Sequence, residues 1–112
     1  MPTNDYIIVL TTCNSSAIAT SVAENLVSNK LAACVNMVKN VESVYQWQGK
    51  IEHDNEILLI IKTTQSLFSR VEQAIQKSHD YELPEIIAVP IQAGEKNYLN
   101  WIQSATLATE QK

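Results

Sequence analysis

The chain has 112 residues, of which 46% are hydrophobic and 18% are charged, so residues 1–112 can fold as one domain with its own core. We expect that core to be ordered over about residues 5–108. The net charge is −4 and the eight Lys and Arg residues are scattered singly, which argues against binding to nucleic acid or to anionic membranes.

The location of the protein can also be predicted from these features. No apolar run is long enough to span a membrane, and the first residues lack the basic-then-apolar pattern of a signal peptide. The two cysteines, Cys13 and Cys34, suit a reducing compartment better than a disulfide framework. We therefore expect a cytoplasmic protein without membrane insertion.

The first predicted elements are a strand and a helix. Residues 6–10 (YIIVL) form a short apolar run rich in β-branched residues, which is typical of a central strand. Residues 11–16 follow as a turn that ends in good N-cap residues. Apolar residues then recur at helical spacing from Ile18 to Leu26, which predicts a helix that ends near residues 29–30.

A long β-hairpin is predicted over residues 31–64. From residue 33 to residue 47 the odd positions are mostly apolar and the even positions mostly polar, which indicates a half-buried strand. Gln48 and Gly49 can take the positive φ that a two-residue turn requires. The returning arm begins polar and ends in the apolar run 57–61, which is long enough to be buried on both faces.

The arms of this hairpin are long for the size of the chain. Roughly fifteen residues at about 3.3 Å each span about 50 Å, whereas a globule of this length is about 35 Å across. We therefore expect the tip, with Tyr45 and Trp47, to project and to meet a partner in a homo-oligomer. The alternative is a bulge near Lys39 and Asn40 that folds the arm back over its own sheet.

A helix, a strand and a second helix are predicted after the hairpin. Ser66 is the expected N-cap of a helix that stops near residues 78–80. Residues 85–91 form a fourth strand, in which Pro90 lacks a ladder donor and therefore indicates an edge position. After Gly94, apolar residues at helical spacing predict a C-terminal helix.

The resulting order, β-α-β-β-α-β followed by α, predicts the fold class. It is the α+β, ferredoxin-like arrangement with an additional C-terminal helix. The two runs that look buried on both faces, residues 6–10 and 57–61, are the ones that this topology places in the middle of the sheet. The alternating strand and the strand with proline are the ones that it places at the edges.

No catalytic constellation is recognisable, so we expect no enzyme. Two glycines cannot build a P-loop or a dinucleotide fingerprint, and neither a zinc motif nor a nucleophile elbow is present. One enzymatic alternative concerns Pro2, which after removal of Met1 could act as a general base, as in small trimeric tautomerases.

Cys13 and His79 are the candidate metal ligands. Cys13 is expected on the loop between the first strand and the first helix, where helix amides favour a thiolate. His79 follows the second helix, with Asp80 and Glu82 nearby. A thiolate and an imidazole suit copper or another soft transition metal. The alternative is that Cys13 is a small buried hydrophobe and that His79 complements the helix dipole.

The aromatic residues have two interpretations. They could line a pocket between subunits, with Lys62 or Glu56 as a polar handle. They could instead serve as interface and core packing, which is the more common role of such residues. The residues concerned are Tyr45, Trp47, Tyr81, Tyr98 and Trp101.

Five segments of the chain resemble the CutA family of divalent-cation tolerance proteins. They are residues 31–36 (LAACVN), 43–52 (SVYQWQGKIE), 59–63 (LIIKT), 81–87 (YELPEII) and 98–102 (YLNWI). The matches run in register from about residue 6 to residue 103. The resemblance implies a heat-stable, ferredoxin-like homotrimer whose hairpins interlock around a three-fold axis, and a link to tolerance of copper and other divalent cations.

The resemblance also implies two sets of site residues. In relatives for which copper binding is proposed, a cysteine stands at the position of Thr11 and two histidines precede a Pro-Tyr pair, so His79 is matched better than Cys13. The intersubunit cleft of the family, which is implied to bind a small ligand, maps onto Cys34, Trp47, Glu56, Lys62, Tyr81, Glu85, Tyr98 and Trp101.

Three functions follow as hypotheses. The first is a non-enzymatic homotrimer that binds a divalent metal ion, copper first, in the response to metal ions and without an organic cofactor. The second is a signalling module similar to the PII-type trimers, with a small anion or metabolite near Lys62. The third is a scaffold that anchors another protein.

Overall fold

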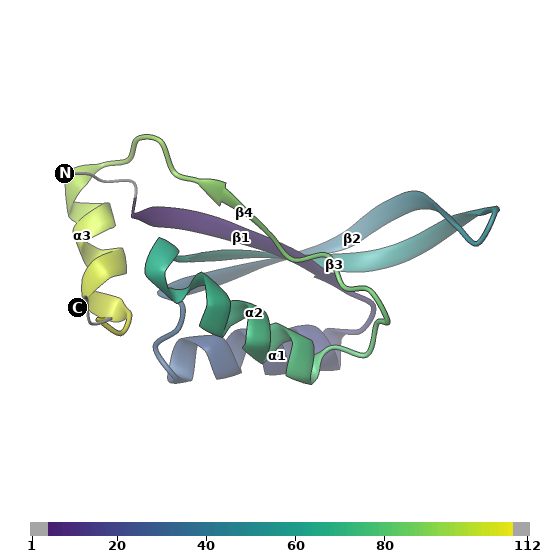
Figure 1. Ribbon diagram of the computed structural model, residues 1–112, viewed down its shortest axis with the longest axis horizontal. Helices are drawn as coiled ribbons and strands as arrows, with labels where there is room; N and C mark the ends of the chain where they lie inside the picture. The colour runs from purple at the N-terminus through teal and green to yellow at the C-terminus, as the bar shows by residue number, and fades with distance from the viewer. Residues whose placement is uncertain (1–4, 109–112) are drawn as a thin grey trace.

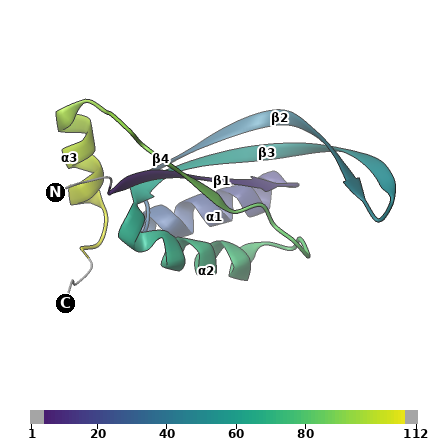
Figure 2. The ribbon, with the colours of Figure 1, turned by 45° about the horizontal axis from the view of Figure 1, so that its top comes forward.

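The computed structural model of the chain describes residues 5–108. Its elements are β1 (Tyr6–Cys13), α1 (Ser16–Ser28), β2 (Cys34–Trp47), β3 (Lys50–Thr64), the 3-10 turn η1 (Gln65–Leu67), α2 (Phe68–Ser78), β4 (Ile87–Pro90) and α3 (Lys96–Ala105). The strands form one antiparallel sheet in the order β2-β3-β1-β4, and α1 and α2 lie on one of its faces (Figures 1 and 2). This order confirms the ferredoxin-like α+β fold, with β1 and β3 in the centre.

The core lies between the sheet and the two helices. Alternate residues of β1 face the helices and pair with residues of β3 that point the same way. All of the following are at most 8% exposed: Ile7, Val9, Cys13, Ile57, Leu59 and Ile61 from the sheet, and Ala19, Val22, Leu26, Val71 and Ile75 from the helices. The apolar residues that predicted the first helix therefore pack against the two central strands.

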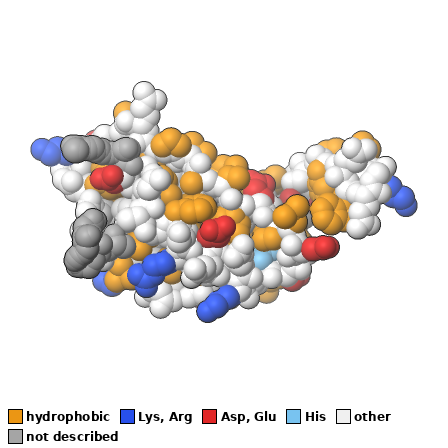
Figure 3. Space-filling view, in the orientation of Figure 1, with side chains coloured by type: hydrophobic (Ala, Val, Ile, Leu, Met, Phe, Trp, Pro, Cys, Tyr) orange, Lys and Arg blue, Asp and Glu red, His pale blue; other side chains and the backbone are white. Residues whose placement is uncertain are grey.

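The opposite face of the sheet carries no helix (Figure 2). Its apolar residues come from all four strands: Ile8, Leu10, Val38, Leu58, Ile60, Ile87 and Val89. Ile87 and Val89, on the edge strand β4, are 50% and 45% exposed. Figure 3 shows exposed hydrophobic side chains across the middle of the molecule and again on the projecting arm. The chain on its own therefore leaves a broad apolar surface in contact with water.

Helix α3 closes the end of the sheet opposite the hairpin tip (Figure 1). The Tyr6 hydroxyl donates to Gln103 Oε1 at 2.9 Å, and the Leu107 amide donates to the Lys30 carbonyl at 2.9 Å. No helix in residues 5–108 is both long enough and apolar enough to cross a membrane.

The hairpin formed by β2 and β3 projects from the body, as its length predicts. The longest dimension of the chain is 46 Å, and the radius of gyration is 14.8 Å, against about 13 Å for a compact domain of this length. Gln48 and Gly49 form the predicted turn with φ values of 52° and 83°, and Trp47 pairs with Lys50 across it.

Strand β2 also contains a bulge at the position that the sequence analysis considered as the alternative to a projecting hairpin. The pairing passes from Val38 opposite Leu58 to Val41 opposite Glu56, and Asn40 takes a φ of 61°. One extra residue therefore lies in β2. Both features are present, because β2 contains the bulge and the curved arm still extends beyond the body (Figure 2).

The bulge turns the apolar side of β2 from one face of the ribbon to the other. Before it, Val35 and Met37 lie opposite β3 residues that face the helices. After it, Tyr45 and Trp47 share the face of Glu56 instead. The two aromatic residues are 40% and 37% exposed, so the half-burial expected from the alternation is not reached within one chain.

Three local predictions need correction. β1 does not end at residue 10, because its pairing with β3 continues through Cys13 and Ile57. Ser66 does not cap α2: it lies within η1, and its hydroxyl is 3.3 Å from that of Thr64. Strand β4 is shorter than predicted, although Pro90 does lie on an edge strand. The suggested role for Pro2 lies outside the described residues.

Candidate binding groove

A groove lies where the hairpin arm leaves the sheet. β1 ends at Cys13 while β2 and β3 continue, and the segment 80–86 runs past that end on its way to β4 (Figure 1). The groove has a volume of about 660 Å³, which is within the range of small-molecule sites. It is lined by Thr12, Ser43, Val44, Tyr45, Trp47, Glu56, Asp80, Tyr81, Glu82, Leu83 and Glu85.

The lining of this groove is acidic and aromatic. Four of the twelve acidic residues of the chain lie here, namely Glu56, Asp80, Glu82 and Glu85, and no Lys, Arg or His is among the described lining residues. The aromatic side chains are those of Tyr45, Trp47 and Tyr81. In Figure 3, acidic and hydrophobic side chains lie next to each other where the arm joins the body. A concave surface of one charge sign attracts the opposite charge, so the groove favours cations over anions.

Glu56 is the buried carboxylate of the groove. Its side chain belongs to a residue that is only 6% exposed, and its Oε2 accepts a hydrogen bond from the Tyr81 hydroxyl. Its Oε1 accepts no hydrogen bond, and the carboxylate forms no ion pair, within residues 5–108. Buried carboxylates are normally paired or fully hydrogen-bonded. Glu56 therefore retains an acceptor that is open to the groove, because Thr11 Oγ1 is the only fully buried side-chain oxygen without a partner in residues 5–108.

Two tyrosine rings of the groove are held by carboxylates. Burial, the hydrogen bond to Glu56 and the negative charge of Glu56 together raise the pKa of Tyr81 well above its ordinary value. The Tyr45 hydroxyl donates to Asp54 Oδ2 in the same way, and this bond is the main cause that raises the pKa of Tyr45 to about 12. Both phenols therefore stay neutral at physiological pH, and their rings have fixed orientations.

His79 lies directly behind the groove, at the C-cap of α2. Its side chain is 1% exposed. Nε2 lies 2.5 Å from the Thr12 carbonyl oxygen, and Nδ1 lies 3.2 Å from the Tyr81 backbone nitrogen. Since a carbonyl can only accept and an amide N–H can only donate, Nε2 carries the proton and Nδ1 is the acceptor. A neutral imidazole thus ties the end of β1 to the wall of the groove.

Cys13 had been expected on a loop, but it is the last residue of β1. Its side chain is fully buried on the face that packs against the helices. Burial, followed by the negative charges of Glu56 and Asp80, raises the pKa of the thiol to about 11. The expectation that helix amides favour a thiolate here is therefore wrong.

The copper site expected at Cys13 and His79 stays a prediction, and the structure shows what it would require. His79 would have to give up one of its two backbone hydrogen bonds, and Cys13 would have to lose a strongly held proton. No group of three or more His, Cys, Asp and Glu side chains is arranged to hold a metal ion within residues 5–108. These residues therefore do not form a ready-made copper site in the single chain.

The eight residues implied for a cleft divide into two groups. Trp47, Glu56, Tyr81 and Glu85 line the groove. The other four lie toward the opposite end of the sheet: Cys34 and Lys62 pair across β2 and β3, and Tyr98 and Trp101 lie on α3 with ring centroids 5.4 Å apart. Lys62 is six residues from Glu56 along β3, or about 20 Å, and its Nζ donates to Asn36 Oδ1. One subunit therefore does not bring Lys62 to the groove.

Sequence reasoning missed several residues of the groove. Thr12 and Ser43 had no distinguishing pattern, and Asp80 and Glu82 were considered only as neighbours of His79. The available signal was the density of acidic residues in the segment 80–85, where three of six residues are Asp or Glu.

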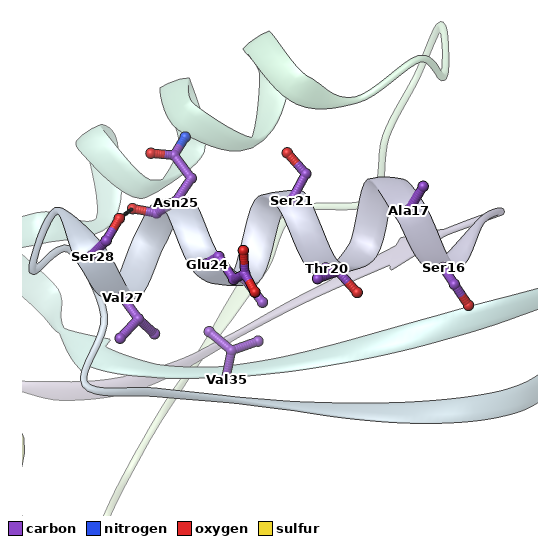
Figure 4. Close-up of a pocket in the computed structure, with 10 residues that line it drawn as sticks. Ser16, Ala17, Thr20, Ser21, Glu24, Asn25, Val27, Ser28 and Val35 are labelled. Carbon is purple, nitrogen blue, oxygen red and sulfur yellow. Dashed lines mark hydrogen bonds between the residues drawn. The ribbon is translucent and has the colours of Figure 1, made fainter.

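A second hollow lies along the outer side of α1 and is a weaker candidate. Figure 4 shows Val27 of α1 and Val35 of β2 pointing toward each other, while the Ser and Thr hydroxyls are spread along the helix. Glu24 is its only charged lining residue among those described. Polar groups do not converge there as they do in the groove.

Comparison with known proteins places this architecture in a family. Residues 7–105 match the family model described as "CutA1 divalent ion tolerance protein". "Divalent-cation tolerance protein CutA" of Thermus thermophilus is 41% identical over 99 residues, which cover 88% of this chain and 96% of that protein. "Protein CutA, chloroplastic" of Arabidopsis thaliana is 44% identical over 100 residues, which cover 89% of this chain but 55% of that protein. The chain thus spans about half the length of the plant relative.

Solved structures agree with this match. The crystal structure of CutA1 from Oryza sativa superposes with a TM-score of 0.91 at 39% identity, covering 96% of this chain and 100% of the other. The Cut A1 divalent cation tolerance protein from Thermus thermophilus gives a TM-score of 0.88 at 40% identity, covering 90% of this chain and 98% of the other.

The relatives contradict the expected cytoplasmic location. The proteins from Arabidopsis thaliana and Oryza sativa are named as chloroplastic, and the solved structure from Archaeoglobus fulgidus is described as periplasmic. That prediction relied on the absence of a signal-peptide pattern and on two cysteines. Relatives that share this domain are assigned to other compartments, so these features do not determine its location.

Proposed function

Since the chain belongs to the CutA1 divalent ion tolerance protein family, we propose that it acts in divalent cation tolerance as a non-enzymatic homotrimer that binds divalent cations at the groove. The observation that carries this proposal is the lining of the groove, with four carboxylates and no basic residue among those described. Such a surface concentrates cations.

The identity of the cation depends on which donors it reaches. Carboxylate oxygens suit Mg²⁺, Ca²⁺ and Mn²⁺, whereas imidazole and thiolate suit copper. The carboxylates of Asp80, Glu82 and Glu85 lie on the open side of the groove, while the His79 ring lies behind it. Loose, exchangeable attraction of a cation to these carboxylates leaves the bonds of His79 intact, whereas tight copper binding at His79 requires one of its backbone bonds to open.

The proposed homotrimer is supported by the apolar sheet face and by the placement of the cleft residues. A face that leaves Ile87 and Val89 half exposed would be buried by neighbouring subunits. The two groups of cleft residues lie at opposite ends of the chain, and a closed ring would bring the arm of one subunit to the α3 end of the next. The intersubunit cleft implied by the family resemblance needs such a contact.

Calorimetric titration of the metal-free protein with Cu²⁺ and with Mn²⁺ tests the proposal, with the assembly mass measured by light scattering. We expect both ions to bind, and a triple variant with Asp80→Asn, Glu82→Gln and Glu85→Gln to lose at least about tenfold in Mn²⁺ affinity. His79→Gln serves as the control, since it keeps these three carboxylates. Equal Mn²⁺ binding by wild type and triple variant would overturn the groove as the site, and a single-chain mass would overturn the trimer.

A copper result can be interpreted separately. If Cu²⁺ affinity falls in His79→Gln but not in the triple variant, the copper site is at the histidine, as the sequence predicts. If it falls only in the triple variant, copper binds like the other divalent ions.

A further inference from the structure

We infer that Asn14 is a site of spontaneous deamidation, at which the chain gains one negative charge as it ages. Asn14 and Ser15 form the connection between β1 and α1, and Asn14 is exposed. The modification is independent of the proposed cation binding, because it needs only water and these two residues. It therefore adds a covalent change with time to a protein whose proposed function is reversible binding.

The reaction joins the side chain of Asn14 to the backbone of the next residue. The Ser15 backbone nitrogen gives its proton to water or hydroxide and attacks the side-chain carbonyl carbon of Asn14. The new C–N bond closes a succinimide ring, the bond from that carbon to Nδ2 breaks, and ammonia leaves after it has taken a proton back from water. A water molecule then opens the ring at either carbonyl, which leaves aspartate or isoaspartate, and nothing is oxidised or reduced.

The local structure leaves the attacking nitrogen free. The Ser15 hydroxyl caps α1 by accepting from the Ile18 amide at 3.1 Å, and the Ser15 carbonyl accepts from the Ala19 amide at 3.0 Å. The Ser15 backbone N–H, by contrast, donates to no group within residues 5–108, and the Asn14 side chain forms no hydrogen bond there. Ser15 also has a small, unbranched side chain, which hinders ring closure less than a β-branched one.

The other asparagines of the described chain lack this combination. Asn29 is exposed at the end of α1, but the Lys30 amide that follows it donates to a carbonyl of α1 at 3.0 Å. The Tyr98 amide, which follows Asn97, donates to Glu95 Oε1 at 2.8 Å. A backbone held in a helix or strand must first open locally, and a larger following side chain hinders the attack further. The asparagines in this position are Asn25, Asn36, Asn40, Asn55 and Asn100.

Asn14 also lies away from the surfaces that the proposed trimer buries. These surfaces are the sheet face without a helix and the projecting arm (Figure 2). Asn14 instead leads into α1, and the first residues of that helix, Ser16 and Ala17, border the hollow on its outer side (Figure 4). Water therefore reaches Asn14 in the assembled protein.

The two products have opposite effects on α1. The first turn of this helix contains no acidic residue. Aspartate in place of Asn14 would put a negative charge beside the helix N-terminus, where such a charge is favourable. Isoaspartate would add a methylene group to the main chain immediately before Ser15 and so displace the cap. We therefore expect the isoaspartate form to melt at a lower temperature than the unmodified protein, and the aspartate form not to.

Timed incubation of the assembled full chain in mildly alkaline buffer, below its unfolding temperature, tests the inference. Ion exchange separates the more negative forms, and mass spectrometry of proteolytic fragments locates the mass gain of about 1 Da. We expect Asn14 to be converted at least about tenfold faster than any other asparagine in residues 5–108. Asn14→Gln should remove this early charge change. Ser15→Thr keeps a capping hydroxyl but is β-branched, and it should slow the conversion at least about threefold.

A sample unfolded in urea provides the reference for an unprotected chain. The inference would be overturned if Asn14 stays intact in the assembled protein while it reacts in the unfolded chain, since the loop or a neighbouring subunit would then protect it. Earlier conversion of Asn29 or of another described asparagine would overturn it as well. The purified isoaspartate form and Asn14→Asp are then compared by melting temperature, and equal values for the two would contradict the effect on the cap.

Discussion

Replacing His79 with alanine should destabilise the protein by about 3 kcal/mol even when no metal is present. The side chain is 1% exposed and joins two parts of the chain that are 67 residues apart in sequence, through the bond from Nε2 to the Thr12 carbonyl. Its other nitrogen accepts the Tyr81 amide. If His79 bound copper through one ring nitrogen, it would keep one of these bonds and lose the other.

The magnitude follows from these contacts. Each of the two hydrogen bonds contributes about 1 kcal/mol, and the cavity left by a buried ring adds about 1 kcal/mol more. His79→Gln is the matched variant, because its amide nitrogen can still donate to Thr12, whereas its amide oxygen lies beside that nitrogen and does not replace Nδ1 as the acceptor of the Tyr81 amide. We expect His79→Gln to lose about half as much stability as His79→Ala.

Guanidinium unfolding at one fixed protein concentration in EDTA measures these differences, since the stability of an oligomer depends on concentration. A free energy of unfolding for His79→Ala within about 0.5 kcal/mol of the wild type would refute the structural role of the ring. If the loss is observed, a copper-binding defect in His79→Ala does not by itself identify a ligand.

Three further predictions concern the thiol, the hairpin turn and the loop before α3. Because burial and the charges of Glu56 and Asp80 raise the pKa of the Cys13 thiol to about 11, the stability that its neutral form contributes is complete below the ordinary thiol pKa and is lost as the pH rises through 11. As the pH rises through this range, the free energy of unfolding should fall less in Cys13→Ala than in the wild type. The same fall in both proteins would contradict this. Gly49→Ala should cost about 1 kcal/mol of stability, because φ at Gly49 is 83°, even though an added Cβ would meet no other atom within 4 Å. An unchanged melting temperature would contradict the need for glycine in this turn. Gly94→Ala should cost up to about 1 kcal/mol, because the new Cβ would lie 2.9 Å from Leu99 Cδ2 and the leucine side chain would have to turn away. That cost should disappear in a Leu99→Ala background.

The elements predicted correctly are those with local causes. Gln48 and Gly49 specify the turn because their own backbone must take positive φ. The run 57–61 lies in a central strand because every residue in it is apolar, whichever face it points to. Signals of this kind are complete within a few residues, so the element order and the sheet order followed from the sequence.

The parts that were missed depend on distant partners. Alternation along β2 indicates a strand, and a bulge near Asn40 was considered only as an alternative that folds the arm back, so the change of face before Tyr45 and Trp47 was not predicted. The bonds of His79 to Thr12 and of Tyr81 to Glu56 span 67 and 25 residues. Their pairing is a property of the assembled fold, and the acidic groove became visible only with it.

The bulge in β2 lets the arm change direction without changing which residues pair beyond it. Val38 lies opposite Leu58 and Val41 opposite Glu56, so two residues of β2 lie opposite one residue of β3. Deleting Asn40 would make this pairing one to one, and it would leave Tyr45 opposite Glu52 and Trp47 opposite Lys50, on the face of Glu56. The deletion would therefore remove the local kink and extra twist and keep the rings on their face. The bulge sets the direction in which the arm leaves the sheet, whereas the pairing from the turn at Gln48 and Gly49 sets the face that carries the rings.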